Sequence, residues 1–470
     1  MTSNMAVATP VNSAPLSAAH PSGNPGAGID YDLFLDCVHC GLCTASCPTY
    51  VELGNENDGP RGRIHLMRAV TDERLELTSE VRRHLELCLD CRACETACPS
   101  GVQYGTLLES ARAWLERPAR PDDHDRGARS HRSLRGKFLR RVVVGRVMAD
   151  PGLFRFSIQA MRLADQLGLG GLAAALMPRG FESRRWAGAL RPEPMANWMR
   201  FPGARSVNKG GAIVIPGAPP LSGRLAFLTG CVMSGLFGRV NEASVRVLLR
   251  EGWEVLIPTG STCCGALAAH AGLADDARRL AERTAARFRE NPVDWIVTNA
   301  AGCGAMLKEY DHWTSGGTGL AARARDVSQI LAQNPLRGPL MPPYRLLPTK
   351  RHGEPIRVVY HDACHLAHGQ RITAEPRALL AQIPGTEIVP MAEGDVCCGS
   401  AGSYNILEPE MAARLGHRKA GHVRAARPDI VTAGNVGCLV QIRGSLAATE
   451  KVPLPTTAHF MEILDASAAN

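Results

Sequence analysis

Two copies of one cysteine spacing begin 51 residues apart near the start of the chain. Both follow the pattern Cys-x2-Cys-x2-Cys-x3-Cys-Pro, with Cys37, Cys40, Cys43 and Cys47 in the first copy and Cys88, Cys91, Cys94 and Cys98 in the second. The first three thiolates of such a run can bind one [4Fe-4S] cubane, while the fourth points away and ligates the other cluster. The sequence therefore predicts two clusters with exchanged fourth ligands: Cys37, Cys40, Cys43 and Cys98 for cluster 1, and Cys88, Cys91, Cys94 and Cys47 for cluster 2.

Zinc and disulfides are the alternatives for these eight cysteines. A structural zinc site usually takes its cysteines from two separated Cys-x2-4-Cys pairs rather than from three closely spaced cysteines and a proline-flanked fourth. A disulfide framework requires an oxidising compartment, and no feature of the sequence suggests export. The pattern favours iron–sulfur clusters over both alternatives.

The composition is that of a globular metalloprotein. With 470 residues and 16 cysteines, the chain has room for two or three domains and is expected to keep its thiols reduced. Residues 1–28 are rich in Ala, Pro, Ser and Gly, which predicts a disordered tail. The longest apolar run, residues 167–177, is too short to span a bilayer. We expect a cytoplasmic location, with any membrane contact peripheral and on the cytoplasmic face of the plasma membrane.

Positive charge is concentrated between Arg117 and Arg205, where 18 Lys and Arg residues stand against 7 Asp and Glu. A solvated helical linker would explain this excess, and so would a surface that binds anionic lipid headgroups or an acidic partner subunit. The segment carries no recognised nucleic-acid-binding motif, so no nucleic-acid partner is expected. We predict a basic helical linker over residues 117–222.

The segments around the two cysteine runs predict a small helical domain. Gly59-Pro60 is expected to start a helix that continues through residues 64–70, with further helices over residues 79–87 and 107–115. Arg61 and Arg63 could lie against cluster charge or could be plain surface arginines. His39 is expected to donate to cluster sulfide rather than to bind iron. We predict a ferredoxin-like domain over residues 29–116, held together by its metal more than by an apolar core.

From about residue 224 onward the chain repeats itself with an offset of about 134 residues. Strands are expected over residues 225–229, 254–258 and 294–298, and again over residues 358–361, 387–390 and 429–432. Each expected strand is followed by cysteines: Cys231, Cys263, Cys264 and Cys303 in the first half, and Cys364, Cys397, Cys398 and Cys438 in the second. Helical stretches separate the strands, which is typical of an open parallel sheet with ligands at the carboxyl ends of its strands. We therefore expect the four cysteines of each half to converge on one rim.

The eight C-terminal cysteines could bind metal, form disulfides or fill small buried positions. A disulfide between adjacent cysteines is strained, so the two Cys-Cys pairs are poor structural bridges. Buried free cysteines are common singly but not as two matched sets of four. The pattern favours metal binding in at least one half, and iron–sulfur over zinc. His361 and His365 flank Cys364 and could bind or tune a metal, or could be structural polar contacts.

These residues resemble two known families. The C-terminal halves are similar to the CCG domains of the heterodisulfide reductases. The chain combines the two ferredoxin-type runs with Asp-Gly-Pro-Arg-Gly-Arg from residue 58, Ser-Gly-Val from residue 100, Cys-Cys-Gly-Ser-Ala-Gly-Ser-Tyr from residue 397 and Ile-Val-Thr-Ala-Gly-Asn-Val-Gly-Cys from residue 430. Through these motifs it most resembles the iron–sulfur subunit of glycolate oxidase, over residues 30–464. One departure is that Ala300 or Asn435 replaces the first cysteine of the Cys-x2-Cys that ends each reductase half. This departure argues against a noncubane, disulfide-cleaving site, whereas four thiolates per half suffice for a cubane.

The resemblance implies an electron-transfer subunit of a membrane-peripheral 2-hydroxy-acid oxidase. A partner flavoprotein with FAD would oxidise glycolate to glyoxylate. Electrons would pass singly through the two [4Fe-4S] clusters, and through any further iron–sulfur clusters in the CCG halves, to a quinone or another acceptor. No dinucleotide-binding Gly-x-Gly-x-x-Gly follows a strand, so we expect neither FAD nor a catalytic residue on this chain. The alternatives are a lactate or glycerol-3-phosphate dehydrogenase subunit, a CCG thiol/disulfide reductase, and a metal-free or zinc-bearing docking scaffold.

The expected fold is therefore α+β with several domains. The helical bis-[4Fe-4S] ferredoxin-like domain and the helical linker are expected to precede a duplicated α/β CCG domain with parallel sheets. Its two repeats are expected to cover residues 223–340 and 341–470.

Overall fold

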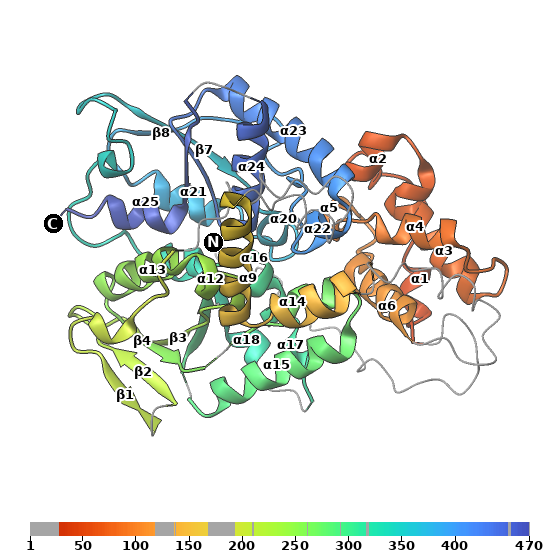
Figure 1. The fold of residues 1–470 in the computed structure, drawn as a ribbon, viewed down its shortest axis with the longest axis horizontal. Coiled ribbons are helices and arrows are strands. Elements are labelled where there is room, and N and C mark those ends of the chain that lie inside the picture. The colour runs from red at the N-terminus through yellow and green to blue at the C-terminus, as the bar shows by residue number, and fades with distance from the viewer. Residues whose placement is uncertain are drawn as a thin grey trace, which may run out of the picture.

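A computed structural model of the chain describes residues 28–117, 136, 138–167, 193–208, 211–260, 262–291, 293–315, 319–449 and 453–469. Of the tail predicted over residues 1–28, residues 1–27 lie outside the described residues, as does much of the basic segment, residues 118–135 and 168–192. Figure 1 shows a helical amino-terminal domain at one end of the molecule and two α/β halves at the other. Among the described residues, no helix combines the length and the apolar character needed to cross a bilayer.

Short helices form the amino-terminal domain, as the sequence predicted. The predicted Gly59-Pro60 start is the amino end of α3, where proline's missing N–H costs no helical hydrogen bond. Thr78 caps α4 by accepting from Val81 N at 3.2 Å. Phe34 lies fully buried in the apolar core between these helices. The elements are α1 (Asp32–Leu35), α2 (Pro48–Leu53), η1 (Glu56–Asp58), α3 (Pro60–Thr71), α4 (Ser79–Glu86), α5 (Ala93–Thr96) and α6 (Tyr104–Glu116).

Two mainly parallel sheets form the C-terminal part of the chain. The first sheet has the order β1-β2-β4-β3-β5-β6 and the second the order β10-β9-β7-β8. Strands β4-β3-β5-β6 are mutually parallel, and so are β8-β7-β9-β10. The two quartets therefore share order and direction, which confirms the duplicated domain with parallel sheets. The strands of the quartets are β3 (Gly223–Phe227), β4 (Trp253–Pro258), β5 (Trp295–Thr298), β6 (Ala324–Asp326), β7 (Ile356–His361), β8 (Thr386–Ile388), β9 (Ile430–Ala433) and β10 (Thr456–His459).

Helices follow corresponding strands in the two halves. The pairs are α12 (Cys231–Leu236) with α20 (Cys364–Ala367), α15 (Ala274–Arg289) with α23 (Pro409–Ala426), and α16 (Ala301–Lys308) with α24 (Val436–Thr449). The other helices are η3 (Trp198–Arg200), α13 (Gly238–Arg250), α14 (Ala266–His270), α17 (Tyr310–Trp313), α18 (Leu320–Arg323), α19 (Val327–Leu331), η5 (Tyr344–Leu346), α21 (Ala374–Leu380), α22 (Tyr404–Leu407) and α25 (Phe460–Ala466).

The first sheet also takes in part of the segment expected to be a helical linker, residues 117–222. β1 (Arg205–Val207) and β2 (Ala212–Ile215) form an antiparallel pair, and β2 pairs with β4 in the antiparallel sense. A four-residue apolar run such as β2 cannot be assigned to strand or helix from periodicity alone. The linker is helical, as predicted, in the π-helical segment η2 (Leu139–Val147) and in α9 (Pro151–Gln166). Figure 1 shows α9 crossing in front of both halves.

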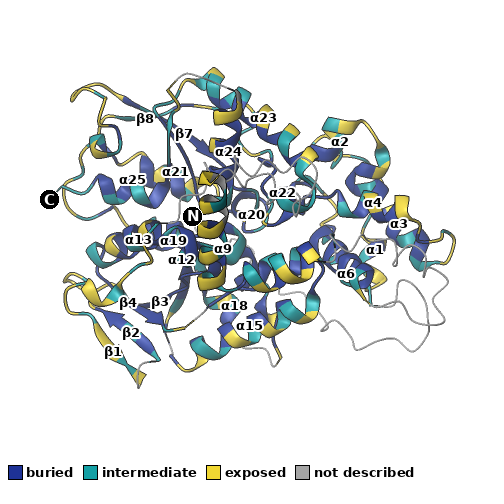
Figure 2. Cartoon of the chain, viewed as in Figure 1, coloured by how far each residue is buried: buried dark blue, intermediate teal, exposed yellow. Residues whose placement is uncertain are grey.

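One apolar core joins the two halves. Leu225 on β3 and Val255 on β4 belong to the same buried cluster as Val358 on β7 and Ile430 on β9. Figure 2 shows the inner strands buried and the exposed residues on outer helix faces such as that of α23. This packing fixes the two quartets relative to each other, and therefore fixes the cysteines that follow their strands.

Candidate metal centres

The two ferredoxin-type loops have the same backbone shape. The residues on either side of the second cysteine have positive φ angles in both: His39 (55°) and Gly41 (83°) beside Cys40, and Asp90 (55°) and Arg92 (60°) beside Cys91. This conformation is strained for residues other than glycine, so the surrounding structure must hold it in place. The shared shape lets both loops present their cysteines in the same way.

The cysteines predicted for cluster 1 line one small cavity. We call them set 1: Cys37, Cys40, Cys43 and Cys98. Burial raises the pKa of the Cys43 thiol, and the nearby Cys37 and Cys98 thiols raise it further. Because Cys98 lines the same cavity as Cys37, Cys40 and Cys43, the last cysteine of the second run lies beside the first run, as the exchanged assignment requires. Set 1 is the more accessible centre, because Cys40 is exposed and Cys37, Cys43 and Cys98 are half-buried.

The cysteines predicted for cluster 2 lie together in the interior. We call them set 2: Cys47, Cys88, Cys91 and Cys94, all of which are buried. Burial raises the pKa of Cys94, and Cys91, Cys88 and Cys47 raise it further by their proximity. Buried thiols with raised pKa values hold their protons unless a metal cation replaces them, which is the chemistry of thiolate ligation.

Arg63 is a fully buried cation beside set 2. It donates from Nη1 to Cys47 Sγ at 3.9 Å and from Nη2 to Thr49 Oγ1 at 3.1 Å. Burial alone would lower the pKa of Arg63, but the anionic forms of Cys88, Tyr104, Cys47 and Asp58 around it keep that pKa above its ordinary value. A buried guanidinium in this position offsets negative charge on the thiolates of set 2, and Arg63 is not a plain surface arginine.

Arg61 and His39 have more peripheral positions. Arg61 lines the set 1 cavity, donates to His39 O at 3.1 Å and pairs with Glu56 at 2.6 Å. The His39 ring is exposed and packs edge-on against His65, with 6.4 Å between ring centroids. This position gives no support to the expectation that His39 donates to cluster sulfide.

The C-terminal cysteines converge in each half, as the sequence predicted. Set 3 comprises Cys231, Cys263, Cys264 and Cys303, and its sulfur atoms approach in pairs, Cys231 with Cys263 at 3.3 Å and Cys264 with Cys303 at 3.2 Å. Set 4 comprises Cys364, Cys397, Cys398 and Cys438, in which Cys364 lies close enough to Cys397, and Cys438 to Cys398, to affect its pKa. All sixteen cysteines of the chain are free thiols, and 3.2–3.3 Å is far longer than a disulfide bond.

Glycine permits the sharp turn after each Cys-Cys pair. Gly265 and Gly399 have φ angles of 96° and 87°, and a side chain on either would press against the backbone carbonyl of the helix behind it. An added Cβ would lie 2.9 Å from Ala277 O in the first half and 2.7 Å from Ala412 O in the second. Glycine therefore allows the loop to carry its thiols against the helix.

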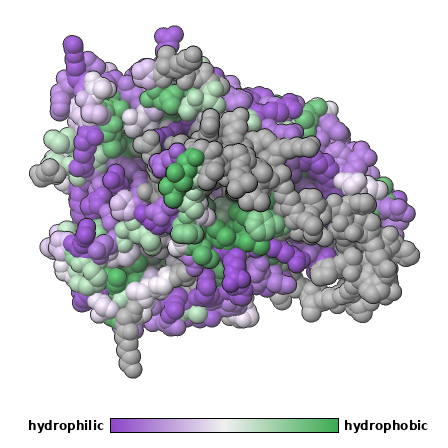
Figure 3. Space-filling view, viewed as in Figure 1, coloured by the Kyte–Doolittle hydropathy of each residue, from purple (hydrophilic) through white to green (hydrophobic). Residues whose placement is uncertain are grey.

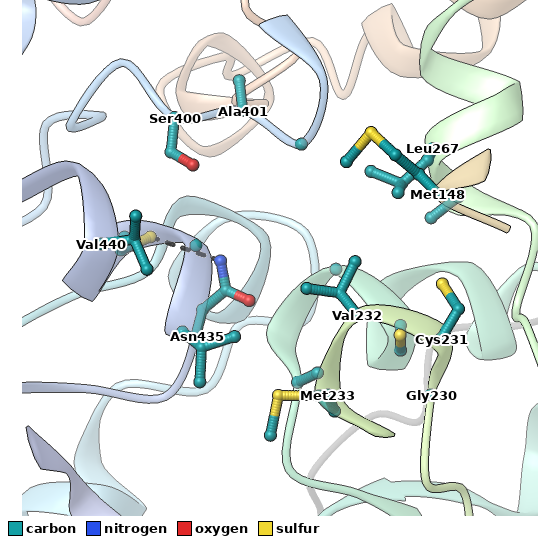
Figure 4. Close-up of a pocket in the computed structure, with 18 of the residues that line it drawn as sticks. Met148, Gly230, Cys231, Val232, Met233, Leu267, Ser400, Ala401, Asn435 and Val440 are labelled. Atoms are coloured by element: carbon teal, nitrogen blue, oxygen red, sulfur yellow. Dashed lines mark hydrogen bonds between the residues drawn. The ribbon is translucent and has the colours of Figure 1, made fainter. Parts of the chain in front are cut away.

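All eight C-terminal cysteines line one cavity of about 400 Å³ between the halves. Figure 4 shows Cys231 and Val232 of the first half on one side and Asn435 and Val440 of the second half on another. Asn435 Nδ2 donates to Cys438 Sγ at 3.4 Å, while Ala300 occupies the corresponding place in the first half. Apolar side chains from η2 and α9 complete the wall: Val143, Val147, Met148, Phe154 and Ile158. Eight converging soft donors in a largely apolar cavity fit iron–sulfur clusters better than hard, oxygen-preferring cations.

Set 2 lies directly beside set 4. The Cys91 thiol is close enough to Cys364 and Cys397 for each to influence its neighbour's pKa. His365, which follows Cys364, donates from Nε2 to Asp90 O at 2.7 Å, inside the loop of set 2. The four sets therefore form a continuous series from the exposed Cys40 to the cavity between the halves.

Each C-terminal half also contacts the set 2 loop through one side chain. In both halves this residue lies six positions after the second cysteine of the Cys-Cys pair. In the first half His270 Nδ1 donates to Asp90 Oδ2 at 2.9 Å, and in the second half Tyr404 OH donates to Leu87 O at 2.7 Å. Sequence reasoning missed these contacts. Their matching positions in the repeat were the only available signal, and that signal does not identify the partner.

Comparisons with known proteins agree with this geometry. Residues 34–102 match the family described as a 4Fe-4S dicluster domain, and residues 225–308 and 358–443 each match a family described as a cysteine-rich domain. The chain is 34% identical to the probable glycolate oxidase iron-sulfur subunit of Bacillus subtilis, over 88% of this chain and 89% of the relative. It is 30% identical to the glycolate oxidase iron-sulfur subunit of Escherichia coli, over 91% and 93%. It is also 29% identical to one of the subunits of the fumarate reductase (CoM/CoB) of Methanothermobacter marburgensis, over 87% and 68%.

The fold and the cysteine sets define an iron–sulfur protein with a two-cluster [4Fe-4S] domain and a duplicated cysteine-rich domain. Such proteins act as subunits of oxidoreductase complexes. The chain belongs to the family of glycolate oxidase iron–sulfur subunits.

Proposed function

We propose that this chain is the electron-transfer subunit of a glycolate oxidase complex. A partner flavoprotein with FAD oxidises glycolate to glyoxylate, and this chain carries the electrons toward a quinone or another acceptor. Sets 1 and 2 each hold one [4Fe-4S] cluster, and sets 3 and 4 hold further iron–sulfur centres. The observation that carries this proposal is the continuous series of four cysteine sets, which begins at the surface and ends in the cavity between the halves.

The clusters, when bound, supply one-electron transfer, and the chain supplies their spacing and surroundings. Arg63 places a buried positive charge beside set 2, which favours the reduced, more negative state of a cluster there. His365 fixes the set 2 loop to the set 4 helix through Asp90 O, so the two centres are held at a constant separation. We also propose that residues 29–116 form the ferredoxin-like domain and that residues 223–340 and 341–470 form the two CCG repeats.

The surface around set 1 is suited to a partner that donates electrons. Leu35, Val38 and Leu42 are 56%, 67% and 62% exposed and lie in or next to the first loop. The positions in the second loop that correspond to Val38 and Leu42 are Leu89 and Ala93, and both are buried in the same apolar cluster as Cys397. One loop thus packs against the C-terminal halves, and we propose that the other packs against the flavoprotein.

We further propose a cytoplasmic location with peripheral contact to the membrane or to a membrane-bound acceptor. Helix α9 supports this proposal, because Leu153, Phe156 and Leu163 recur along it and are all about half-exposed or more. Figure 3 shows apolar side chains gathered near the middle of the face that α9 crosses. Binding of the protein to anionic and neutral vesicles, with Phe156→Ser as the comparison, tests this contact.

A thiol/disulfide reductase is the main alternative, and the cavity between the halves favours electron transfer over it. A noncubane site of the reductase type would need a further thiolate in each half, and Ala300 and Asn435 occupy those places. Disulfide reduction that is abolished by Cys397→Ser, with the clusters of sets 1 and 2 intact, would favour the reductase instead.

The decisive experiment uses the full chain purified anaerobically together with its co-purifying flavoprotein. Glycolate should reduce the clusters, and dithionite-reduced protein should show the magnetically coupled signals of two neighbouring cubanes. Reduction by lactate or glycerol 3-phosphate but not by glycolate would replace the proposed substrate. Absence of coupled cubane signals would remove the proposed route altogether.

A further inference from the structure

The two C-terminal halves have the same cysteines but differ at one buried position beside them. Three residues before the first cysteine of each set lies Leu228 in the first half and His361 in the second. Leu228 is 1% exposed and joins an apolar core, whereas His361 is completely buried at the carboxyl end of β7. Burying an imidazole costs more free energy than burying a leucine unless both ring nitrogens find a bonding partner. A histidine at this position in one half alone therefore needs a bonding partner for each nitrogen.

The hydrogen bond at Nδ1 determines which nitrogen of His361 is left to bind a metal. Nδ1 lies 3.0 Å from Gly394 O, and because a carbonyl oxygen can only accept, Nδ1 carries the proton. Nε2 therefore has a free lone pair, and it finds no hydrogen-bond donor among the described residues. Burial lowers the pKa of His361 well below its ordinary value, with the positive charge of Lys419 as a second cause, so the ring is neutral. Metal-binding histidines typically have this arrangement, in which one nitrogen donates to a carbonyl and the other is left to bind.

The His361 ring lies beside two cysteines of set 4. One ligand nitrogen of His361 and the sulfur atoms of Cys398 and Cys438 all lie within 4.8 Å of one another. Metal–nitrogen and metal–sulfur bonds of about 2.0–2.3 Å allow one ion to bind all three atoms at such separations. Cys397 contacts Cys398 and Cys364 and extends the same set.

The charge around set 4 also differs from that around set 3. Lys419 on α23 is 2% exposed, donates from Nζ to Glu393 O, and lies close enough to Cys398 and Cys397 to interact with their charge. When α15 and α23 are aligned on Ala277 and Ala412, the position of Lys419 corresponds to the neutral Thr284. The second half thus combines a neutral nitrogen donor with a buried cation.

We propose that His361 Nε2 is a ligand of the metal centre in the second half, together with Cys398 and Cys438. Set 4 is then a mixed sulfur and nitrogen site, whereas set 3 is a sulfur-only site. The proposal rests on the proposed function only in that set 4 holds a metal. Replacement of thiolate by imidazole raises the reduction potential of an iron–sulfur centre, so the centre at set 4 should be the more easily reduced of the two.

The test compares four versions of the full chain, purified anaerobically: wild type, His361→Leu, Cys438→Ser and His459→Leu. His361→Leu gives the second half the residue that the first half already has. Cys438→Ser identifies which metal and which spectroscopic signals belong to set 4. His459→Leu is the matched control, because His459 is also a completely buried imidazole of the second half with an unpaired Nε2, but is not grouped with the set 4 cysteines as His361 is.

The readouts are iron, zinc and sulfide content, and the coordination of the metal that Cys438→Ser removes. We expect nitrogen coordination in the wild type, seen as ¹⁴N coupling for a paramagnetic centre or by X-ray absorption for zinc. His361→Leu should abolish this coordination and speed metal loss to a chelator by about 10-fold or more, while His459→Leu should change neither.

Two results would overturn the proposal. Retention of nitrogen coordination and of metal in His361→Leu would show that the imidazole is structural. No loss of metal in Cys438→Ser would show that set 4 binds none. Neither result touches the clusters of sets 1 and 2, whose coupled signals are measured in the same samples, so failure here is distinguishable from failure of the proposed function.

Discussion

Arg63 offers the sharpest test of how the chain tunes a cluster. The substitution Arg63→Met removes a completely buried cation from beside set 2 and leaves an unbranched side chain of similar length. The guanidinium lies 3.9 Å from Cys47 Sγ, and it also bridges His84 O at 2.7 Å and Thr49 Oγ1 at 3.1 Å. Because an added electron makes the cluster more negative, loss of the cation should make the cluster at set 2 harder to reduce.

The size of the effect follows from Coulomb's law. Two unit charges about 4 Å apart interact by about 4 kcal/mol at an effective dielectric constant of about 20. A one-electron potential changes by about 59 mV for each ~1.4 kcal/mol, which sets an upper limit of about 170 mV. Since the added electron is spread over a cluster whose centre lies beyond the sulfur atom, we expect the potential to fall by about 80 mV. Loss of one member of a buried charge network should also lower the free energy of unfolding by about 3–5 kcal/mol.

The assay is a redox titration of the anaerobic protein followed by the electron paramagnetic resonance of each cluster. Arg61→Met is the matched control, since Arg61 belongs to the same segment but is about one-third exposed and pairs with Glu56. Its removal should shift the cluster at set 1 by about 40 mV or less, because a charge in a water-like dielectric interacts about four-fold more weakly. If Arg63→Met does not hold its clusters, Arg63→Lys retains the charge and should keep the potential near that of the wild type. An unchanged potential at set 2 in Arg63→Met, or an equal shift in Arg61→Met, would refute the reasoning.

Three further predictions concern other parts of the chain. Cys98→Ser should remove the cluster signal of set 1 and Cys47→Ser that of set 2, and loss of the opposite cluster in either variant would contradict the exchanged ligands. Val38→Glu should weaken association with the flavoprotein and slow glycolate-driven reduction of the clusters by about 10-fold, a loss of ~1.4 kcal/mol. Leu163→Glu, at a similarly exposed position on α9, should do neither. Equal effects of the two substitutions would argue against docking at set 1. Burial raises the pKa of the Glu462 carboxyl in the folded protein to about 7. The unfolded chain therefore loses the carboxyl proton at a lower pH than the folded protein does, and the free energy of unfolding should fall as the pH rises from about 4.5 to 7. Thermal unfolding of Glu462→Gln should lack this part of the pH dependence, and identical pH profiles for the two proteins would contradict it.

Much of the local structure could be predicted because its causes are local. The start of α3 follows from Gly59-Pro60. The two ferredoxin-type loops follow from the spacing of their cysteines, which involves only a few residues of backbone. The strands before Cys231 and Cys364 could be placed because the repeat reinforced each weak signal with a second copy. Short strands without such a copy, β1 and β2, were missed.

The surroundings of the cysteines could not be predicted in the same way. Asp90 contacts His270 and His365, which lie 180 and 275 residues farther along the chain, and Tyr404 contacts Leu87 across 317 residues. Such pairs depend on how two sheets and a helical domain pack. The spacing of cysteines carries no information about that packing.

Spacing along a loop and position after a strand are local properties of the backbone, so the division of the sixteen cysteines into four sets could be predicted from the sequence. The exposure of set 1, the contact of set 2 with set 4, and the proximity of His361 to Cys398 and Cys438 depend on how the distant segments pack. The physical reason is burial: the packing of distant apolar segments determines which side chains lose contact with water, and hence which polar atoms must find a partner inside the protein.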